Sequence, residues 1–325
     1  MSSLPQLDLD GFADWARKNR QPYQQHYLAM YSSVFGAVVT DPALMLVPVD
    51  DHMVHRGDAV FETAKCVAGN IYNLRAHLDR LCSSAKGLHI AMPATMQEMT
   101  NVIVETTRAA GQPDALIRIL LSRGPGSLGV SPYECPKPAF YVVVSGYKKP
   151  FMEAHPEGAR VRASALPVKA APFARIKSVN YLFNVLMKKE AVDAGVDFVV
   201  SFDENGHLAE GPTENAGIVT RDGALLVPKL ERILAGTTMI RVLDLARALP
   251  PGGLIRRVAH EDIPRAAVDA AAEVLIFGTT PDVTAVIEFD GRSVGSGKPG
   301  PAFRELSRLL REDILGNRSL HTPMA

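Results

Sequence analysis

Apolar positions with strand and helix periods divide the chain into two groups of elements. In the first half, the pattern predicts helices at residues 8–20, 74–88 and about 95–110, and strands at 31–39, 44–48, 59–66, 70–74, 116–122 and 139–147. The helix at 74–88 has an apolar stripe of Leu74, Leu78, Leu81, Ala85 and Leu88. These elements predict a first compact unit.

The second half begins with a predicted helix from Leu182, whose apolar face is Leu182, Val185 and Leu186 and whose stop is Gly195. A strand meander follows, with segments at 198–202, 207–211, 215–220 and 224–228 and turns at Asn205-Gly206 and Asp222-Gly223. The pattern at residues 234–249 predicts a loop that leads into a helix. The pattern at residues 273–289 predicts a strand, a Gly-Thr-Thr loop and a second strand. The tail after Gly300 predicts a terminal helix and a frayed end.

Runs of strands with a few helices predict an α+β fold of two domains with a cleft between them. The segment "KKPFMEAHPEG" contains two prolines and has no clear period, so the boundary is expected near residues 148–157. This division predicts an N-terminal extension at 1–26, a small α/β domain at 27–150 and a large domain at 151–325.

Composition excludes several classes of function. Thirty-five basic residues balance thirty-five acidic ones, so no overall field attracts nucleic acid or an anionic membrane. The chain has no apolar run long enough for a spanning helix, and its acidic N-terminus lacks the pattern of a secretory leader. Cys66, Cys82 and Cys135 are scattered and odd in number, which favours a reducing, cytoplasmic location and argues against a disulfide framework or zinc site.

Two Gly-Thr-Thr loops suggest an anion site. They are Gly236-Thr237-Thr238 and Gly278-Thr279-Thr280, and the first opens a helix, where free N–H groups and the positive dipole end favour an anion. Either threonine of the first loop could instead be a simple N-cap. The chain has neither G-x-x-x-x-G-K-[ST] nor G-x-G-x-x-G in a strand–helix context, so neither a nucleotide triphosphate nor NAD is indicated.

Three charged residues complete a candidate site. Arg80 lies on the helix at 74–88 but off its apolar stripe, and a guanidinium suits a phosphate. Glu210 ends a short strand before Gly211-Pro212, and Lys177 directly precedes a helix. Most arginines and lysines are simply solvated. A desolvated lysine, however, is a nucleophile towards aldehydes, and an amine, a phosphate pocket and a carboxylate are together what pyridoxal 5'-phosphate requires.

The order of the motifs strengthens this interpretation. "HRGDAVFETAK" (55–65), "HLDRLCSSA" (77–85), "IKSVNYL" (176–182), "LAEGPTENAG" (208–217), "LAGTTMIRV" (234–242) and "GTTPDVTAV" (278–286) occur in that sequence. Together they resemble fold-type IV pyridoxal-phosphate enzymes: branched-chain aminotransferases, D-amino-acid transaminases, (R)-amine transaminases and aminodeoxychorismate lyases. The plant D-amino-acid transaminase group is the most similar, since its members carry stretches like "AMYSSVFGAVVTDPALM" and "KSVNYL".

The resemblance implies a role for each candidate. Lys177 resembles the lysine that binds the cofactor's aldehyde and moves the substrate proton, and Glu210 resembles the partner of the pyridine nitrogen. Tyr181 resembles the tyrosine at the cofactor's phenolic oxygen. The phosphate ligands implied are Arg80, Thr237, Thr238, Thr279 and Thr280, and Asn215 is placed with the cofactor-binding residues. The resemblance also implies a homodimer with the cofactor in the interdomain cleft.

The substrate is the open question. Bacterial D-amino-acid transaminases carry an Arg-x-His pair after the strand that here is "LIRILLS", whereas this chain has "SRGPGSLGVSP". Phe61 corresponds to a residue that lines the substrate pocket, and the carboxylate anchor could be Tyr31, Arg56, Lys65 or Arg123, some of them reaching a neighbouring subunit's site. We expect a transaminase of small amino acids, D-amino acids favoured. The alternatives are a branched-chain or (R)-amine transaminase, a pyruvate-releasing lyase and a non-enzymatic cofactor reservoir.

Overall fold

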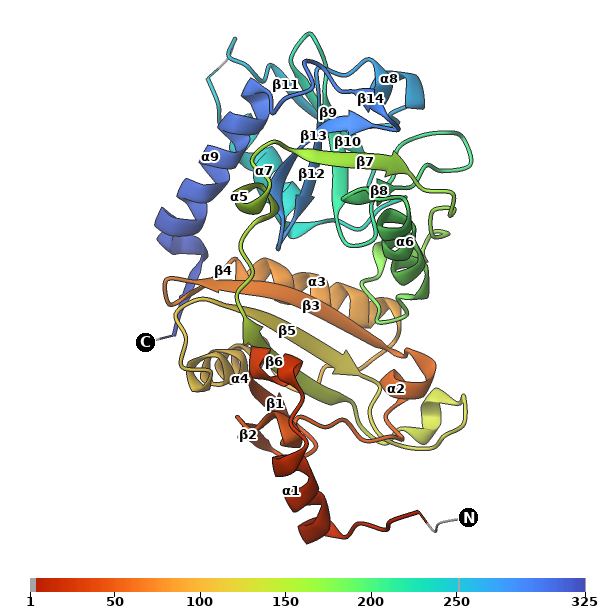
Figure 1. The fold of residues 1–325 in the computed structure, drawn as a ribbon, viewed down its shortest axis with the longest axis vertical. Coiled ribbons are helices and arrows are strands. Elements are labelled where there is room, and N and C mark those ends of the chain that lie inside the picture. The colour runs from red at the N-terminus through yellow and green to blue at the C-terminus, as the bar shows by residue number, and fades with distance from the viewer. Residues whose placement is uncertain (1–3, 251, 325) are drawn as a thin grey trace.

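The first half of the chain forms one antiparallel sheet covered on one face by two helices. The computed structural model describes residues 4–250 and 252–324, and within them this sheet has the order β15-β4-β3-β5-β6-β1-β2 (Figure 1). Its strands are β1 (Tyr27–Ser32), β2 (Ala37–Val39), β3 (Ala59–Val67), β4 (Asn70–Tyr72), β5 (Ala115–Ser122), β6 (Ala139–Gly146) and β15 (His321–Pro323).

Helices α3 (Leu74–Gly87) and α4 (Met96–Ala109) build the core of this half. The predicted stripe of α3 is buried from Leu74 to Ala85 and packs with Met99 and Ile103 of α4 against the sheet, while Leu88 is half-buried. A capping box at Thr95 and Glu98 starts α4. The two helices therefore form where the apolar period of the sequence indicates.

The second half forms a mixed sheet in the order β11-β10-β9-β12-β13-β7-β8, with β14 paired to β13. Its strands are β7 (Ala159–Ala163), β8 (Phe198–Val200), β9 (Asn215–Val219), β10 (Ala224–Pro228), β11 (Arg257–Glu261), β12 (Glu273–Gly278), β13 (Asp282–Phe289) and β14 (Arg292–Ser293). The other helices are α1 (Leu9–Lys18), α2 (His52–Arg56), α5 (Phe151–Ala154), α6 (Leu182–Asp193), α7 (Thr237–Arg247), α8 (Arg265–Asp269) and α9 (Pro301–Gly316). None of the helices in the described residues is long and apolar enough to span a membrane.

The chain passes from the first sheet to the second between Gly146 and Ala159, and α9 lies along the second half and leads the chain back to the first (Figure 1). The α+β architecture predicted from the sequence is confirmed by the two sheets and their helices. The domain limits themselves stay a prediction. The C-terminal strand β15, although distant in sequence, pairs with β4 of the first sheet.

Several local predictions were wrong. The tail does not fray, because β15 continues the edge of the first sheet. Residues 44–48 are not a strand: a 3-10 helix spans Pro42–Leu44, and Pro48 has no N–H for a ladder. The strand predicted at 31–39 is a hairpin of β1 and β2 with Gly36 at φ +64 in its turn. Residues 207–211 make only isolated bridges, and β11 was not predicted.

Helix α6 exists where predicted but faces the other way. Leu182, Val185 and Leu186, the predicted buried face, are exposed, and the buried residues are Asn184, Met187 and Ala191. The side of α6 that carries Asn184 faces the cavity described below, so a polar residue is turned inward and leucines are left outside. The orientation of this helix therefore serves both the cavity, through Asn184, and a small apolar cluster in which Met187 and Ala191 pack against Val199.

Candidate active site

Lys177 lies at the junction of the two sheets, in the extended segment before α6. Its carbonyl accepts a hydrogen bond from the N–H of Phe61 at 2.9 Å, and the N–H of Val179 donates to the carbonyl of Ala59 at 2.9 Å. The N–H of Lys177 donates to Ser84 Oγ of α3 at 3.1 Å. The lysine belongs to the second half of the chain but is held by β3 and α3 of the first.

The amine of Lys177 is shielded from solvent by two aromatic rings. The residue is 8% exposed, its Nζ donates to Tyr181 Oη at 3.2 Å, and the Phe61 ring centroid lies 4.5 Å from Nζ. Burial, and then the positive charge of Arg80, lowers the pKa of Lys177 to about 8. Much more of this amine is neutral at physiological pH than of an ordinary lysine, and the neutral amine is the nucleophile.

Glu210 lies on another wall of the same cavity. Its Oε2 accepts hydrogen bonds from the N–H of Leu234 at 2.9 Å and from Asn215 Nδ2 at 3.4 Å. Removal of the carboxyl from solvent raises the pKa of Glu210 to about 7, against the opposing effects of the Leu234 N–H and of Lys169. A cation that entered the cavity, such as a protonated heterocyclic nitrogen, would stabilise the ionised carboxylate.

Arg80 is fixed by a carboxylate that the sequence reasoning did not single out. Glu62 of β3 is fully buried and accepts from Arg80 Nε and Nη2, each at 2.7 Å, while Arg80 Nη1 donates to the carbonyl of Ala235 at 2.9 Å. Burial disfavours ionised Glu62, but the charge and hydrogen bonds of Arg80 outweigh it and lower the pKa to about 2. His77 Nδ1 lies 2.8 Å from the same carboxylate. The guanidinium is therefore locked in place, with its remaining N–H groups available to an anion.

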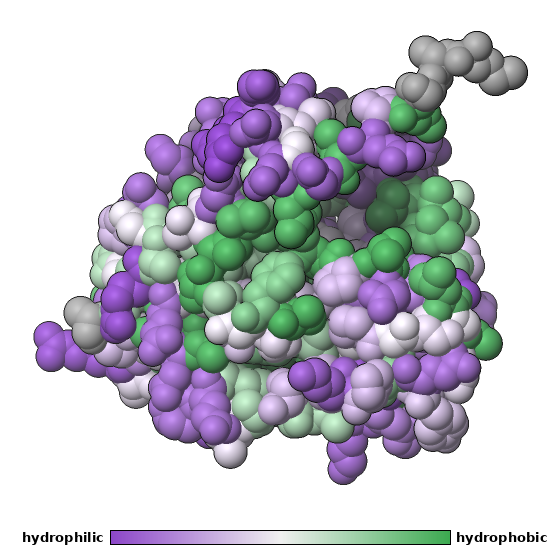
Figure 2. All heavy atoms as spheres, turned by 90° about the horizontal axis from the view of Figure 1, so that it is seen from below, coloured by the Kyte–Doolittle hydropathy of each residue, from purple (hydrophilic) through white to green (hydrophobic). Residues whose placement is uncertain are grey.

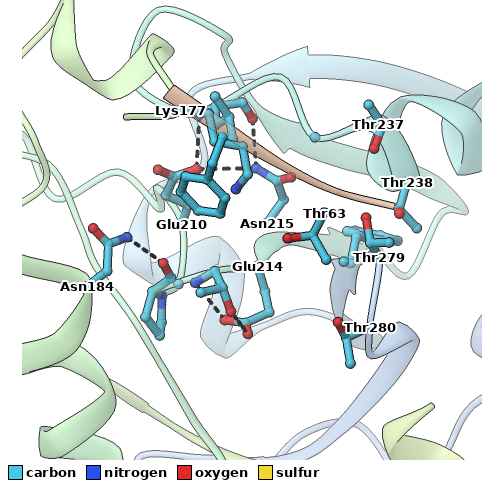
Figure 3. A pocket seen from close by; sticks show the side chains of 18 of the residues that line it. Thr63, Lys177, Asn184, Glu210, Glu214, Asn215, Thr237, Thr238, Thr279 and Thr280 are labelled. Atoms are coloured by element: carbon cyan, nitrogen blue, oxygen red, sulfur yellow. Dashed lines mark hydrogen bonds between the residues drawn. The ribbon is translucent and has the colours of Figure 1, made fainter. Parts of the chain in front are cut away.

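The four threonines gather on one side of the cavity (Figure 3). Thr237 and Thr238 form the first turn of α7, while Thr279 and Thr280 lie in the loop between β12 and β13. A Cβ at Gly236 would lie 1.8 Å from Asn215 Oδ1, so glycine is required where the loop meets Asn215. This side offers hydroxyls, helix N-terminal N–H groups and Arg80, which are donors suited to a phosphate.

The cavity has a volume of about 250 Å³ and brings together residues from both sheets. Figure 3 shows Lys177, Glu210, Asn215, Asn184 and Glu214 on the part of the wall away from the four threonines. Tyr181 lies with Lys177, whose Nζ donates to its hydroxyl. A nucleophilic amine, a carboxylate and a phosphate-binding side thus share one enclosed space. This donor set fits pyridoxal phosphate, which has an aldehyde, a basic ring nitrogen and a phosphate.

Comparison with known proteins agrees with the geometry. The family model of amino-transferase class IV matches residues 59–289, more than half of the chain.

The chain belongs to the class IV aminotransferases. It is 38% identical over 291 residues to the chloroplastic D-amino-acid transaminase of Arabidopsis thaliana, covering 89% of this chain and 77% of that protein. It is 34% identical over 267 residues to a putative branched-chain-amino-acid aminotransferase of Methanocaldococcus jannaschii, covering 82% and 90%. The T.th. branched-chain amino acid aminotransferase complexed with N-(5'-phosphopyridoxyl)-L-glutamate superposes with a TM-score of 0.82 at 29% identity, covering 92% of this chain and 99% of that one.

This class IV aminotransferase is therefore an enzyme of fold type IV, and its cofactor is pyridoxal phosphate. The structure places all of the cofactor-binding residues predicted from the sequence around the one cavity. They are Arg80, Lys177, Tyr181, Glu210, Asn215, Thr237, Thr238, Thr279 and Thr280. Phe61, predicted to line the substrate pocket, lies there too.

The structure does not bring the four predicted carboxylate anchors to the cavity. Arg56 donates to the carbonyls of Leu128 and Gly129, and Arg123 forms a fork with Asp58 at 2.9 and 3.0 Å. Tyr31 packs on Phe140 with ring centroids 6.4 Å apart. Lys65 is buried in an ion pair with Asp282. Within this chain each of the four residues contacts another part of the protein. The sequence does not reveal these contacts, because the partners are distant along the chain or carry no recognisable motif.

Two cations line the cavity instead. Arg118 and Lys169 were not among the predicted site residues, and within residues 4–250 and 252–324 the side chain of neither forms a hydrogen bond or ion pair. The sequence did contain a hint of Arg118, because it is the one charged residue in the apolar strand "ALIRILLS". In the sheet it lies opposite Thr63 of β3, which also lines the cavity. Lys169 lies in an irregular segment without such a signal.

The raised pKa of Glu210 predicts a pH dependence of stability in the cofactor-free protein. Because the folded-state pKa of about 7 exceeds the ordinary 4.5, the folded state binds the extra proton, and the resulting stabilisation is present below pH 4.5 and lost as pH rises through 7. The size is on the order of 1–3 kcal/mol. Urea unfolding at pH 5 and 7.5 should show this loss in the wild type, and Glu210→Gln should remove it. The exposed variant Glu231→Gln is the control, and an unchanged difference in Glu210→Gln would contradict the assignment.

Proposed function

We propose that the protein is a transaminase that moves the amino group of a small D-amino acid, such as D-alanine or D-glutamate, to a 2-oxo acid. The 38% identity to the plant D-amino-acid transaminase supports the D-amino acid. The single observation that carries a carboxylate substrate is the pair of cations, Arg118 and Lys169, on the cavity wall, neither of which has a side-chain hydrogen bond or ion pair in the part of the chain that the structure describes. A small substrate fits, because about 250 Å³ is at the low end of ligand pockets and the cofactor takes part of it.

The residues of the chain divide the work in this proposal. Bound pyridoxal phosphate supplies an electron sink for the carbanion left when the substrate loses its α-proton. Lys177 would hold the cofactor through its aldehyde, and the neutral amine of Lys177 would move the substrate's α-proton, as base and then as acid. Glu210 would pair with the protonated ring nitrogen, and Tyr181 would hydrogen-bond the phenolic oxygen. Arg80, Thr237, Thr238, Thr279 and Thr280 hold the phosphate.

The carboxylate anchor in this proposal is Arg118, assisted by Lys169. Arg118 Cζ lies 5.3 Å from the Phe61 ring centroid, and Lys169 Nζ lies 4.9 Å from that of Tyr181. The same two rings flank the Lys177 amine. A carboxylate bound at either cation would thus lie beside the amine that reacts. Charge-assisted hydrogen bonds to a carboxylate are among the stronger recognition contacts.

A second candidate is a branched-chain L-amino-acid transaminase. It is favoured by the 34% identity to the Methanocaldococcus jannaschii protein and by the aminotransferase structures that superpose on this chain. The apolar part of the cavity, with Phe61, Ile176 and Phe277, could take a branched side chain. The two candidates differ in substrate handedness, which solution assays separate directly.

The first functional prediction concerns handedness. The purified protein is titrated with D-alanine, L-alanine, D-glutamate, L-leucine and (R)-phenylethylamine, and the visible absorbance of the bound cofactor is followed. D-Alanine and D-glutamate should bleach this absorbance, whereas L-alanine should leave it unchanged. Bleaching by L-leucine alone would favour the branched-chain candidate. Release of pyruvate from aminodeoxychorismate without bleaching by any amine would favour a lyase. Lys177→Ala is the control, and it should give no borohydride-reducible cofactor adduct.

The second functional prediction concerns the anchor. Arg118→Leu should raise the KM for the amino donor roughly 10- to 100-fold, because a charge-assisted contact to the carboxylate is lost. The Kd for pyridoxal phosphate should stay within about twofold of wild type, since Arg118 is not among the proposed phosphate ligands. Lys169→Met should act in the same direction but more weakly. Arg123→Leu provides a matched control for loss of an arginine, and a rise in its KM equal to that of Arg118→Leu would count against Arg118.

The protein is also proposed to be a homodimer. Beside α1 the surface is hollowed to a volume of about 530 Å³, and apolar side chains gather around the hollow (Figure 2). Trp15, Tyr23, Tyr27 and Leu46 line it and are exposed. An apolar surface of this kind on a folded chain commonly marks a protein interface.

The third functional prediction tests this assembly. Light scattering during size exclusion should give twice the monomer mass, and Leu46→Glu should shift the protein towards monomer by placing a charge in the apolar hollow. Leu315→Glu, a substitution of an exposed leucine on α9, is the control and should remain dimeric. A wild-type mass equal to one chain would contradict the dimer.

A reducing, cytoplasmic location remains part of the proposal. Cys66, Cys82 and Cys135 are all free thiols. Burial raises the pKa of the Cys66 thiol to about 11, which makes it a poor nucleophile. These thiols fit a compartment in which disulfides do not form.

A further inference from the structure

Lys65 is a buried cation that the proposed reaction does not use. It lies on β3 two and four residues after Thr63 and Phe61, on the same face of the strand, because strand side chains alternate. Phe61 and Thr63 line the main cavity, whereas Lys65 is 4% exposed and lies beyond its end. There it is paired with Asp282, the first residue of β13.

The ion pair joins the two sheets directly behind the threonine side of the cavity. Lys65 and Asp282 line a small gap together with Thr237, Thr238 and Thr279. These three threonines also line the main cavity. These three threonines therefore separate the main cavity from the Lys65–Asp282 ion pair.

Asp282 also ends the loop that carries Thr279 and Thr280. The register of β12 and β13 pairs Gly278 with Asp282, so the loop is only the three residues between them. Asp282 has φ +55, in the left-handed region that glycine adopts most easily. Aspartate is among the few non-glycine residues that tolerate this region, so the position combines the turn with a carboxylate that pairs with Lys65.

Burial raises the pKa of Asp282, and the charge and hydrogen bond of Lys65 oppose that rise. Without Lys65 the carboxylate would be left buried and unpaired, so it would take up a proton or move the loop towards solvent. Either response removes the ion pair that ties the loop to β3, so Thr279 and Thr280 in the β12–β13 loop would be free to shift relative to Arg80 on α3.

We infer that Lys65 and Asp282 are positioning residues: their ion pair fixes the Thr279–Thr280 loop against β3 and thereby sets the affinity of the site for the cofactor's phosphate. This inference rests on the phosphate roles proposed above for the threonines and Arg80. It removes Lys65 from the carboxylate anchors and gives its buried charge a function in cofactor binding.

The test compares pyridoxal phosphate with pyridoxal, which has the aldehyde but no phosphate, on the full-length cofactor-free protein. Lys65→Met should raise the Kd for pyridoxal phosphate at least about tenfold and leave the Kd for pyridoxal within about twofold, measured by the absorbance of the bound aldehyde. Lys65→Arg keeps the positive charge, so its Kd for pyridoxal phosphate should stay much closer to that of the wild type than the Kd of Lys65→Met does. A merely structural lysine would weaken both ligands equally.

Asp282→Gly is the second variant, since it removes the carboxylate while relieving the left-handed backbone. It should reproduce the phosphate-selective loss, and the Lys65→Met/Asp282→Gly double variant should lose no more affinity than either single variant, because both remove the same pair. Lys229→Met, which breaks the exposed pair with Asp262, is the matched control and should change neither Kd.

Arg80→Gln separates this inference from the proposed site. Arg80→Gln could raise the Kd for pyridoxal phosphate more than the Kd for pyridoxal, while Lys65→Met does not. In that case the positioning role is wrong and the phosphate site stands. If Arg80→Gln weakens pyridoxal as much as pyridoxal phosphate, the phosphate assignment is wrong and the inference falls with it. An unchanged Kd for pyridoxal phosphate in both Lys65→Met and Asp282→Gly would also overturn the inference.

Discussion

The site depends on the backbone hydrogen bonds that tie the Lys177 segment to β3. The carbonyl of Lys177 and the N–H of Val179 pair with Phe61 and Ala59, so the segment that precedes α6 is attached to the opposite half of the molecule. This attachment places the amine between the rings of Phe61 and Tyr181 and out of water. Its lowered pKa follows from that position, and a lysine in a free loop would remain an ordinary cation.

The same junction explains why the phosphate side is built from both halves of the chain. Arg80 comes from α3 and is locked by Glu62, whereas the threonines come from α7 and from the β12–β13 loop. A buried guanidinium without a counter-charge would be costly, so Glu62 and its pKa of about 2 are as necessary to the site as the arginine itself. Donors held by rigid elements need little rearrangement when an anion binds.

The sequence predicted the parts of the site in which local pattern and motif order coincide. Lys177, Glu210 and the two Gly-Thr-Thr loops stand at element boundaries that turn and helix signals mark, and the structure gathers them at one cavity. The partners of Arg123 and Lys65 could not be predicted, because Asp58 and Asp282 are 65 and 217 residues away along the chain. The orientation of α6 was wrong for a related reason. A periodic stripe of Leu182, Val185 and Leu186 indicates a core only when a core lies beside it.

Pairing, rather than the presence of a cation, decides which residue can bind a substrate carboxylate. Arg123, Lys65 and Arg56 already donate to protein oxygens, whereas within the described residues the side chains of Arg118 and Lys169 form no hydrogen bond or ion pair and lie over aromatic rings. Phe61 and Tyr181 meet edge to face at 5.0 Å, with Arg118 at the first ring and Lys169 at the second. Since both rings also flank Lys177, the proposed carboxylate site at these cations lies beside the proposed nucleophile, whereas the paired cations lie outside the cavity.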